Sequence, residues 1–229
     1  MIYLTGDTHG GLDGGKLISF ADTPKGKSLT KDDYVIILGD FGYIFYPEET
    51  AREFRELERF NNYPWTTLFL DGNHENFDRI NTFPVKEWCG GQIHKISESV
   101  YHLMRGHVFQ IDGNNLFVMG GAVSIDKEHR REGVTWWAEE NVSYAECEKA
   151  LSSLEAHDNK VDYMLTHTSP NSFIKKISDY IVKDPASDFF DTIKKSVKYK
   201  RWYFGHHHLD LDVGRLSCLY DRVVPLGGK

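Results

Sequence analysis

The sequence predicts an α/β fold, with strands and helices alternating along much of the chain. Five short apolar runs each stop close to an Asp, Asn or His residue, as a buried strand does where it gives way to a loop. Amphipathic segments with helical spacing lie between several of these runs. Shorter strand-like segments between residues 85 and 121 predict a second sheet facing the first.

The strand predictions rest on the apolar runs and on turn residues. Residues 33–38 form a nearly continuous apolar run, which is typical of a central strand covered on both faces. The other runs are residues 2–5, 66–70, 161–166 and 202–204. For the second sheet we expect strands at 100–103, 107–111 and 116–119, with a hairpin turn at 112–115 and closing strands at 209–213 and 216–219.

Three amphipathic helices are predicted. Residues 49–60 present an apolar stripe that we expect to pack on the sheet, made of Ala51, Phe54, Leu57 and Phe60. A capping box at 143–146 opens a helix to about residue 156, with an inner face of Tyr144, Cys147, Leu151 and Leu154. The third helix carries Phe189, Phe190, Ile193 and Val197.

Composition and length indicate one compact domain spanning residues 1–229. The 229 residues are 40% hydrophobic, which is enough for a substantial core, and no linker or internal repeat divides the chain. The start of the chain has no signal-peptide pattern, and no segment approaches membrane-spanning length. We therefore expect a soluble, cytoplasmic protein with no membrane partner.

Charge and cysteine content narrow the classes of partner. The net charge of −7 and the isoelectric point near 5.9 oppose binding to long polyanions, so no stable nucleic-acid complex is expected. Three widely spaced cysteines without a Cys-x-x-Cys pair suit neither a disulfide framework nor a structural zinc site. We predict that they are reduced thiols.

The residues after the apolar runs have the chemistry of metal ligands. Asp7 and His9 are two apart, so in an extended segment both side chains project to the same side. The carboxylate of Asp40 has two oxygens and can bridge two cations, which an imidazole cannot do. The amide oxygen of Asn73 can also bind a metal, and the adjacent His74 can direct a titratable nitrogen toward a metal-bound group.

Histidines follow the last two runs. His167 comes directly after the run at 161–166. In the triplet 206–208, alternation along an extended segment places His206 and His208 on one side and His207 on the other. Only the outer two of these three histidines are therefore expected to bind metal.

The order of these sites resembles the motif set of the calcineurin-like metallophosphoesterases. The motifs are Gly6-Asp7-Thr8-His9, Gly39-Asp40, Gly72-Asn73-His74-Glu75, Thr166-His167 and Gly205-His206-His207-His208. The resemblance implies a four-layer αββα sandwich of two mixed β-sheets flanked by helices. It also implies that one metal ion takes Asp7, His9, His208 and one oxygen of Asp40, and that a second takes the other oxygen of Asp40, Asn73, His167 and His206.

The resemblance implies a phosphoesterase acting on phosphomonoesters or phosphodiesters. Mixed imidazole and carboxylate ligands suit Mn, Fe, Zn or Ni better than Mg, and Mn is the ion we expect in vitro. Two such ions, about 3.5 to 4 Å apart, would activate a bridging hydroxide, with His74 as the general acid. The sequence after Asp40 departs from the protein serine/threonine phosphatases, which argues against a phosphoprotein substrate. We expect a phosphorylated small molecule or a nucleotide.

Three arginines are candidates for substrate binding. Arg79 lies one helical turn from His74, and Arg130 or Arg131 can bind a phosphate bidentately. Trp136 can stack on a ring of the substrate. The alternatives are a surface arginine at 79 and a structural loop at 122–142 whose tryptophans pack on the core. The loop at 122–142 carries no recognisable specificity code, so the substrate stays open, as does the oligomeric state.

Two other functions compete with this assignment. A nuclease of the same fold would need a basic groove, which an acidic chain disfavours. A noncatalytic metal-binding scaffold would be expected to have lost ligands, whereas every expected position is filled here.

Overall fold

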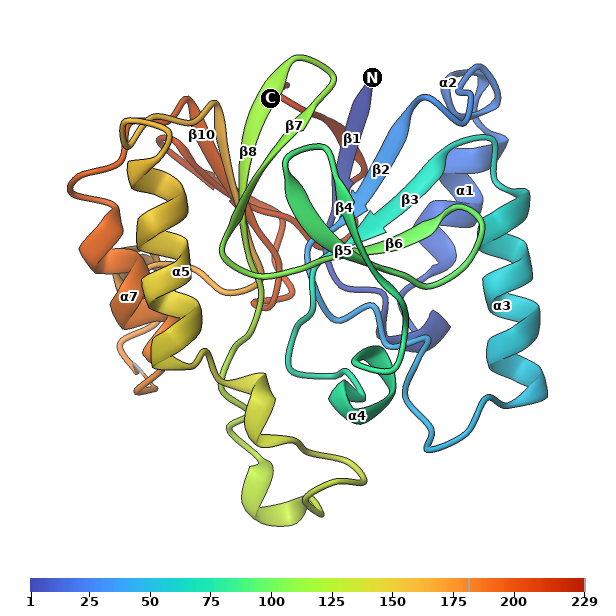
Figure 1. Cartoon of the computed structure of the whole chain (residues 1–229), viewed down its shortest axis with the longest axis horizontal. Helices are drawn as coiled ribbons and strands as arrows, with labels where there is room; N and C mark the ends of the chain where they lie inside the picture. The colour runs from blue at the N-terminus through green and yellow to red at the C-terminus, as the bar shows by residue number, and fades with distance from the viewer. Residues whose placement is uncertain (181, 229) are drawn as a thin grey trace.

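The computed structural model describes residues 1–180 and 182–228. Two β-sheets pack face to face, with helices against their outer faces (Figure 1). Each sheet contains both parallel and antiparallel strand pairs. The predicted α/β fold of two mixed sheets flanked by helices is confirmed.

The first sheet has seven strands in the order β13-β1-β2-β3-β6-β5-β4. Its parallel centre consists of β1 (Ile2–Thr5), β2 (Tyr34–Ile37), β3 (Thr66–Phe69) and β6 (Val100–Leu103). The antiparallel flanking strands are β13 (Val224–Pro225), β5 (Gly91–Lys95) and β4 (Val85–Trp88).

The prediction that residues 100–103 belong to the second sheet was wrong. This segment is β6, and it pairs in parallel with β3 in the first sheet. Strands β4 and β5, in the strand-like region that begins at residue 85, were not predicted individually, and they follow β6 outward in the first sheet. Pairing with β6 satisfies the backbone groups of β3, which would otherwise form an open sheet edge.

The second sheet has six strands in the order β11-β12-β10-β9-β8-β7. Their bounds are His107–Ile111 (β7), Asn114–Met119 (β8), Tyr163–Thr166 (β9), Arg201–Phe204 (β10), Leu211–Val213 (β11) and Leu216–Cys218 (β12). The predicted hairpin and the closing strands are confirmed. Ile111 pairs with Asn114, so Asp112 and Gly113 form a two-residue loop, and both have the positive φ that a type I′ turn requires.

Helices α1 (Gly15–Asp22) and α3 (Ala51–Asn62) cover the first sheet, and α5 (Tyr144–Glu155) and α7 (Pro185–Ile193) cover the second (Figure 1). Shorter helices are α2 (Pro24–Lys27), α4 (Phe77–Ile80) and α6 (Asn171–Ile177), with 3-10 turns η1 (His9–Gly11), η2 (Lys127–His129) and η3 (Ala138–Glu140). Among the described residues, no helix is both long and apolar enough to cross a membrane.

The buried face of α3 differs from the predicted stripe. Phe54 is 54% exposed, whereas Glu53 is buried with Leu57 and Phe60. The Glu53 carboxylate accepts hydrogen bonds from the backbone N–H groups of Phe45 and Tyr46. A polar residue therefore occupies the inner face because it satisfies the backbone of the preceding loop.

The capping box of α5 is confirmed, but its inner face is rotated from the prediction. Ser143 caps the helix, and Ala150 and Leu154 are its buried residues. Tyr144 is 79% exposed and Leu151 is 47% exposed. The chain at Gly106 approaches the backbone of this face of α5 closely, since a Cβ atom there would lie 3.1 Å from the Ala150 nitrogen and 3.2 Å from the Glu146 carbonyl oxygen. Helix α7 ends at Ile193, and the buried Val197 lies beyond it.

An apolar layer between the sheets holds the central strands in place. Leu4, Ile36 and Leu68 of the first sheet belong to one buried cluster with Val118 and Leu165 of the second. The three cysteines are free thiols, as predicted: Cys89, Cys147 and Cys218. The packing fixes the two sheets so that the loops following β1, β2, β3, β9 and β10 meet.

Candidate metal centre

All seven side chains predicted as metal ligands lie in the loops that follow five strands. These loops follow β1, β2 and β3 in the first sheet and β9 and β10 in the second. Close contacts across the sheets bring them together, such as the hydrogen bond from His167 Nδ1 to the carbonyl oxygen of Leu38 at 2.8 Å. The seven residues are Asp7, His9, Asp40, Asn73, His167, His206 and His208.

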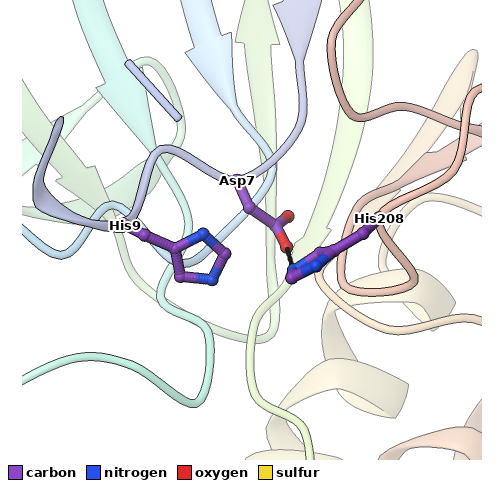
Figure 2. Close-up of side chains that lie close together, drawn as sticks. All are labelled: Asp7, His9 and His208. Carbon is purple, nitrogen blue, oxygen red and sulfur yellow. Dashed lines mark ion pairs between the residues drawn. The ribbon is translucent and has the colours of Figure 1, made fainter. Parts of the chain in front are cut away.

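Acidic and imidazole groups gather into two adjoining sets. One set is Asp7, His9 and His208, and in Figure 2 the two imidazole rings flank the Asp7 side chain. The other set is Asp40, His167 and His206. Within each set, the potential ligand atoms lie within 4.8 Å of one another. A further set, of His9, Asp40 and His74, joins the two.

The spacing of the donor atoms fits divalent ions. His208 Nε2 lies 3.1 Å from Asp7 Oδ2, and His9 Nε2 lies 3.2 Å from Asp40 Oδ2. Nitrogen and oxygen ligands bind an ion at about 2.0 to 2.2 Å, so neighbouring ligands on one ion are separated by about 3 to 3.5 Å. The observed separations lie in this range.

One buried carboxylate oxygen lacks a hydrogen-bond donor, and a bound cation would compensate its charge. Asp7 Oδ2 is buried and has no hydrogen-bond partner among the described residues, although His208 Nε2 is close. The other oxygen, Oδ1, accepts the backbone N–H of His206 at 2.9 Å. A buried carboxylate oxygen without a donor is costly unless an ion compensates it, so this residue fits a metal ligand.

The turns that place these side chains are left-handed, not extended. His9, Asp40, His206 and His208 have φ values of 43°, 49°, 64° and 50°. The predicted alternation along extended segments was therefore the wrong reason for their placement. His206 and His208 still face the cluster, and His207 contacts Ser169 Oγ at 2.8 Å. Such backbone conformations in residues other than glycine cost energy and are found at functional sites.

Hydrogen bonds at the far side of two imidazoles orient them. His9 Nδ1 lies 2.6 Å from Asp13 Oδ2, and His167 Nδ1 donates to the carbonyl oxygen of Leu38. Each ring therefore presents Nε2 to the cluster. Metal-bound histidines commonly have such a hydrogen bond at the ring nitrogen that does not bind the metal. Tyr220 supports His208 by stacking, with ring centroids 4.7 Å apart.

Asp40 dominates the electrostatics of the site. Burial opposes its ionisation, but the charge of His167 and hydrogen bonds from His167 and His9 hold the pKa of Asp40 well below its usual range. Burial alone would lower the pKa of His167, and the charge of Asp40 instead raises it to about 10. The site thus holds two buried carboxylates, of Asp7 and Asp40, which are groups that bind cations.

A family comparison agrees with this geometry. The model described as "Calcineurin-like phosphoesterase" matches residues 1–210. The chain belongs to this family. The clustered His and Asp groups of the chain are consistent with the divalent ions that the family uses.

A curated protein from Schizosaccharomyces pombe (strain 972 / ATCC 24843) also aligns with this phosphoesterase. It is named "Lariat debranching enzyme" and is 23% identical over 235 residues. The alignment covers 86% of this chain and 49% of that protein. The chain thus spans about half the length of this curated relative.

The three arginines predicted to bind substrate lie at different distances from the metal cluster. Arg130 lies beside His74, with its two terminal nitrogens each 3.3 Å from a ring nitrogen, and it pairs with Asp126. Burial lowers the pKa of His74, Asp40 opposes this, and the charge of Arg130 lowers the pKa further. Arg130 is thus the predicted arginine that the fold brings to the cluster.

The other two arginines lie elsewhere. Arg79 forms an ion pair with Glu53 at 3.0 Å and donates to the carbonyl oxygen of Tyr46. Arg131 is exposed, and the contacts described for it join its backbone to Thr135. The contacts described for these two side chains join neither of them to His74 or to a predicted metal ligand, so their role in substrate binding stays a prediction.

Ser124 and Glu140, two residues that orient Asn73, were not predicted from the sequence. The Nδ2 of Asn73 donates to Ser124 Oγ at 3.1 Å, and Ser124 Oγ donates to Glu140 Oε2 at 2.5 Å. This leaves Asn73 Oδ1 facing His167 Nε2, 3.2 Å away. Burial raises the pKa of Glu140 to about 7. Ser124 lies in a loop and Glu140 ends the 3-10 turn η3, and no periodicity in the sequence marks either residue.

Two buried acids flanking Asn73 were also missed. Asp71 accepts hydrogen bonds from Arg105, with Nε at 2.7 Å, and lies 3.0 Å from His102 Nε2. Glu75 accepts the backbone N–H groups of Phe41 and Gly42 at 2.6 and 3.1 Å. Both carboxylates stabilise the loops around the cluster. Glu75 is the last residue of the Gly72-Asn73-His74-Glu75 motif and Asp71 directly precedes it, but neither was given a role from the sequence.

We predict that Ser124→Ala weakens metal binding by about 10- to 100-fold, because the Asn73 amide loses the acceptor that fixes its orientation. Calorimetric titration of Mn²⁺ into chelator-treated protein measures this. Ser187→Ala removes another buried serine hydroxyl, next to Asp184, and serves as the matched control. Equal Mn²⁺ affinity in both folded variants and the parent would refute the orienting role.

Proposed function

We propose that this chain hydrolyses phosphomonoesters or phosphodiesters at a centre of two divalent ions. The observation that supports it most is the position of Asp40, whose two oxygens face different histidines: His9 at 3.2 Å and His167 at 3.4 Å. One ion would take Asp7, His9, His208 and an oxygen of Asp40. The second would take the other oxygen of Asp40, Asn73, His167 and His206.

The donor set suggests the kind of ion. Imidazole nitrogens together with carboxylate oxygens favour Mn, Fe, Zn or Ni over Mg, and we expect Mn to support activity in vitro. When bound, such ions lower the pKa of water and hold phosphate oxygens. The residues of the chain then have to orient the ester and supply a proton to the leaving oxygen.

His74 is the proposed general acid. Its backbone N–H donates to Asp40 Oδ1 at 2.9 Å, which fixes the residue at the edge of the cluster. Its ring lies close to His9 and Asp40, yet outside the two proposed ligand sets. A proton on this ring can reach the oxygen that leaves phosphorus.

Arg130 is the proposed substrate-binding arginine. Its guanidinium contacts the ring of His74, and it is held there by Asp126 at 2.9 Å. A planar guanidinium can hold two phosphate oxygens at once. Arg130 would thus place the phosphate next to the acid.

The proposed substrate is a phosphorylated small molecule or a nucleotide, hydrolysed in the cytoplasm by a single domain of residues 1–229. Three free thiols suit a reducing compartment. A nuclease is the second candidate, since the chain aligns with a protein named "Lariat debranching enzyme". The name of that relative implies that its own substrate is branched. The net charge of −7 disfavours long polyanions.

A chelator-controlled substrate panel tests the proposed activity. We expect the Mn²⁺-loaded protein to hydrolyse nitrophenyl phosphate or bis-nitrophenyl phosphate and to cleave a single-stranded oligonucleotide poorly. Chelation should abolish turnover, and added Mn²⁺ should restore it. Preferred cleavage of the oligonucleotide would favour the nuclease, and stable Mn²⁺ binding with no turnover on any substrate would favour a scaffold.

Asp40→Asn should abolish binding of at least one ion, because an amide offers one neutral oxygen where the carboxylate offers two charged ones. Metal content after Mn²⁺ loading and dialysis measures this, with Asp162→Asn as a control at a partly exposed carboxylate paired with Lys200. Two ions retained in the Asp40 variant would contradict the bridging role.

His74→Asn should keep both ions and lose about 100-fold or more in kcat on an alkyl phosphate ester, whose leaving oxygen needs a proton. The loss on nitrophenyl esters should be smaller, because nitrophenolate leaves without protonation. His157→Asn, at a histidine bonded to the Ser153 carbonyl oxygen, is the control. Equal losses on both ester types would argue against the acid role.

A further inference from the structure

A cavity of about 410 Å³ adjoins the metal centre. It shares two residues with the site, His9 and His74. Much of the rest of its lining is aromatic, contributed by Tyr43, Phe45 and Tyr46. This volume lies within the usual range of small-ligand pockets.

The loop that carries two of the aromatic rings is fixed by its backbone. Glu53 Oε1 accepts the backbone N–H groups of Phe45 and Tyr46 at 2.8 and 3.2 Å. Arg79, paired with the same Glu53, donates to the carbonyl oxygen of Tyr46 at 2.9 Å. The ring of Tyr46 is nevertheless free at the surface, since the residue is 49% exposed. Arg79 therefore shapes this wall.

Another part of the cavity lining is anchored in the protein core. Tyr43 is buried, and its ring lies 4.8 Å from the rings of both Phe41 and Phe60. Arg52 donates to the carbonyl oxygen of Gly10 at 3.1 Å and lines the same cavity. These contacts hold the walls in place before a ligand enters.

The carboxylates that line the cavity are paired with arginines. One guanidinium, of Arg52, and two carboxylates, of Glu53 and Glu56, belong to the lining. Glu53 pairs with Arg79 at 3.0 Å and Glu56 pairs with Arg59 at 2.8 Å. A ring that enters the cavity meets the aromatic side chains of its lining. Aromatic pairs favour offset-stacked or edge-to-face contacts, which the exposed ring of Tyr46 can offer.

We propose that this cavity binds an aromatic ring carried by the leaving group of the phosphoester. The inference rests on the proposed function, in which His74 protonates the leaving oxygen. Because His74 also lines the cavity, the group attached to that oxygen enters the cavity beside it. The cavity then selects esters of alcohols that carry an aromatic ring.

Benzyl and cyclohexylmethyl phosphate test the proposal, because both leaving alcohols are similar in size and basicity and only one is aromatic. With the Mn²⁺-loaded enzyme, kcat/KM for the benzyl ester should exceed that for the cyclohexylmethyl ester by about threefold or more. Tyr46→Leu should remove this preference and Tyr46→Phe should keep it. Tyr144→Leu, at a tyrosine 79% exposed on α5, should also keep it.

Binding of the non-hydrolysable benzylphosphonate and cyclohexylmethylphosphonate separates the two proposals. Tighter binding of the benzyl compound without hydrolysis of either ester would overturn the hydrolase proposal and retain the ring-binding cavity. Hydrolysis of both esters with equal kcat/KM, or an unchanged preference in Tyr46→Leu, would overturn the cavity proposal and leave the hydrolase proposal intact.

Discussion

The site depends on the hydrogen bonds and ion pairs of one buried residue, Asp40. Asp40 is 1% exposed, and its Oδ1 accepts the backbone N–H groups of Asn73 and His74. Its own carbonyl oxygen accepts the N–H groups of Thr8 and His9 at 3.0 and 2.9 Å. One residue thus ties together the loops after β1, β2 and β3. A buried charge has to be compensated, and here histidines from both sheets surround it.

Close approach to Asp40 explains two glycines in the motifs. A Cβ atom at Gly72 would lie 2.1 Å from Asp40 Oδ1, and one at Gly39 would lie 2.1 Å from His167 Nδ1. Gly39 also has a φ of +92°, which other residues rarely adopt. The glycines before Asp40 and Asn73 are therefore required by the tight meeting of the loops, and the donor residues that follow them are aimed at a common point.

Residues far along the chain complete the site from the other side. The irregular segment from Ser124 to Glu140 orients the Asn73 amide and also brings Arg130 to the ring of His74. This segment follows β8 of the second sheet, whereas the aromatic cavity is built by the loop between β2 and α3 of the first. The proposed chemistry and the proposed ring selectivity therefore come from separate elements that meet at His74.

The sequence alone determined the α/β class and the side chains that form the cluster, because apolar runs and the motifs at their ends are local patterns. It did not predict that β6 belongs to the first sheet or that Glu53 is buried. Both depend on contacts with the backbone of other segments, since β6 pairs with β3 and Glu53 accepts the N–H group of Phe45. Only the tertiary structure distinguished Arg130 from Arg79 and linked Ser124 and Glu140 to Asn73. Long-range packing fixes those contacts, and irregular loops carry no periodicity from which to predict them.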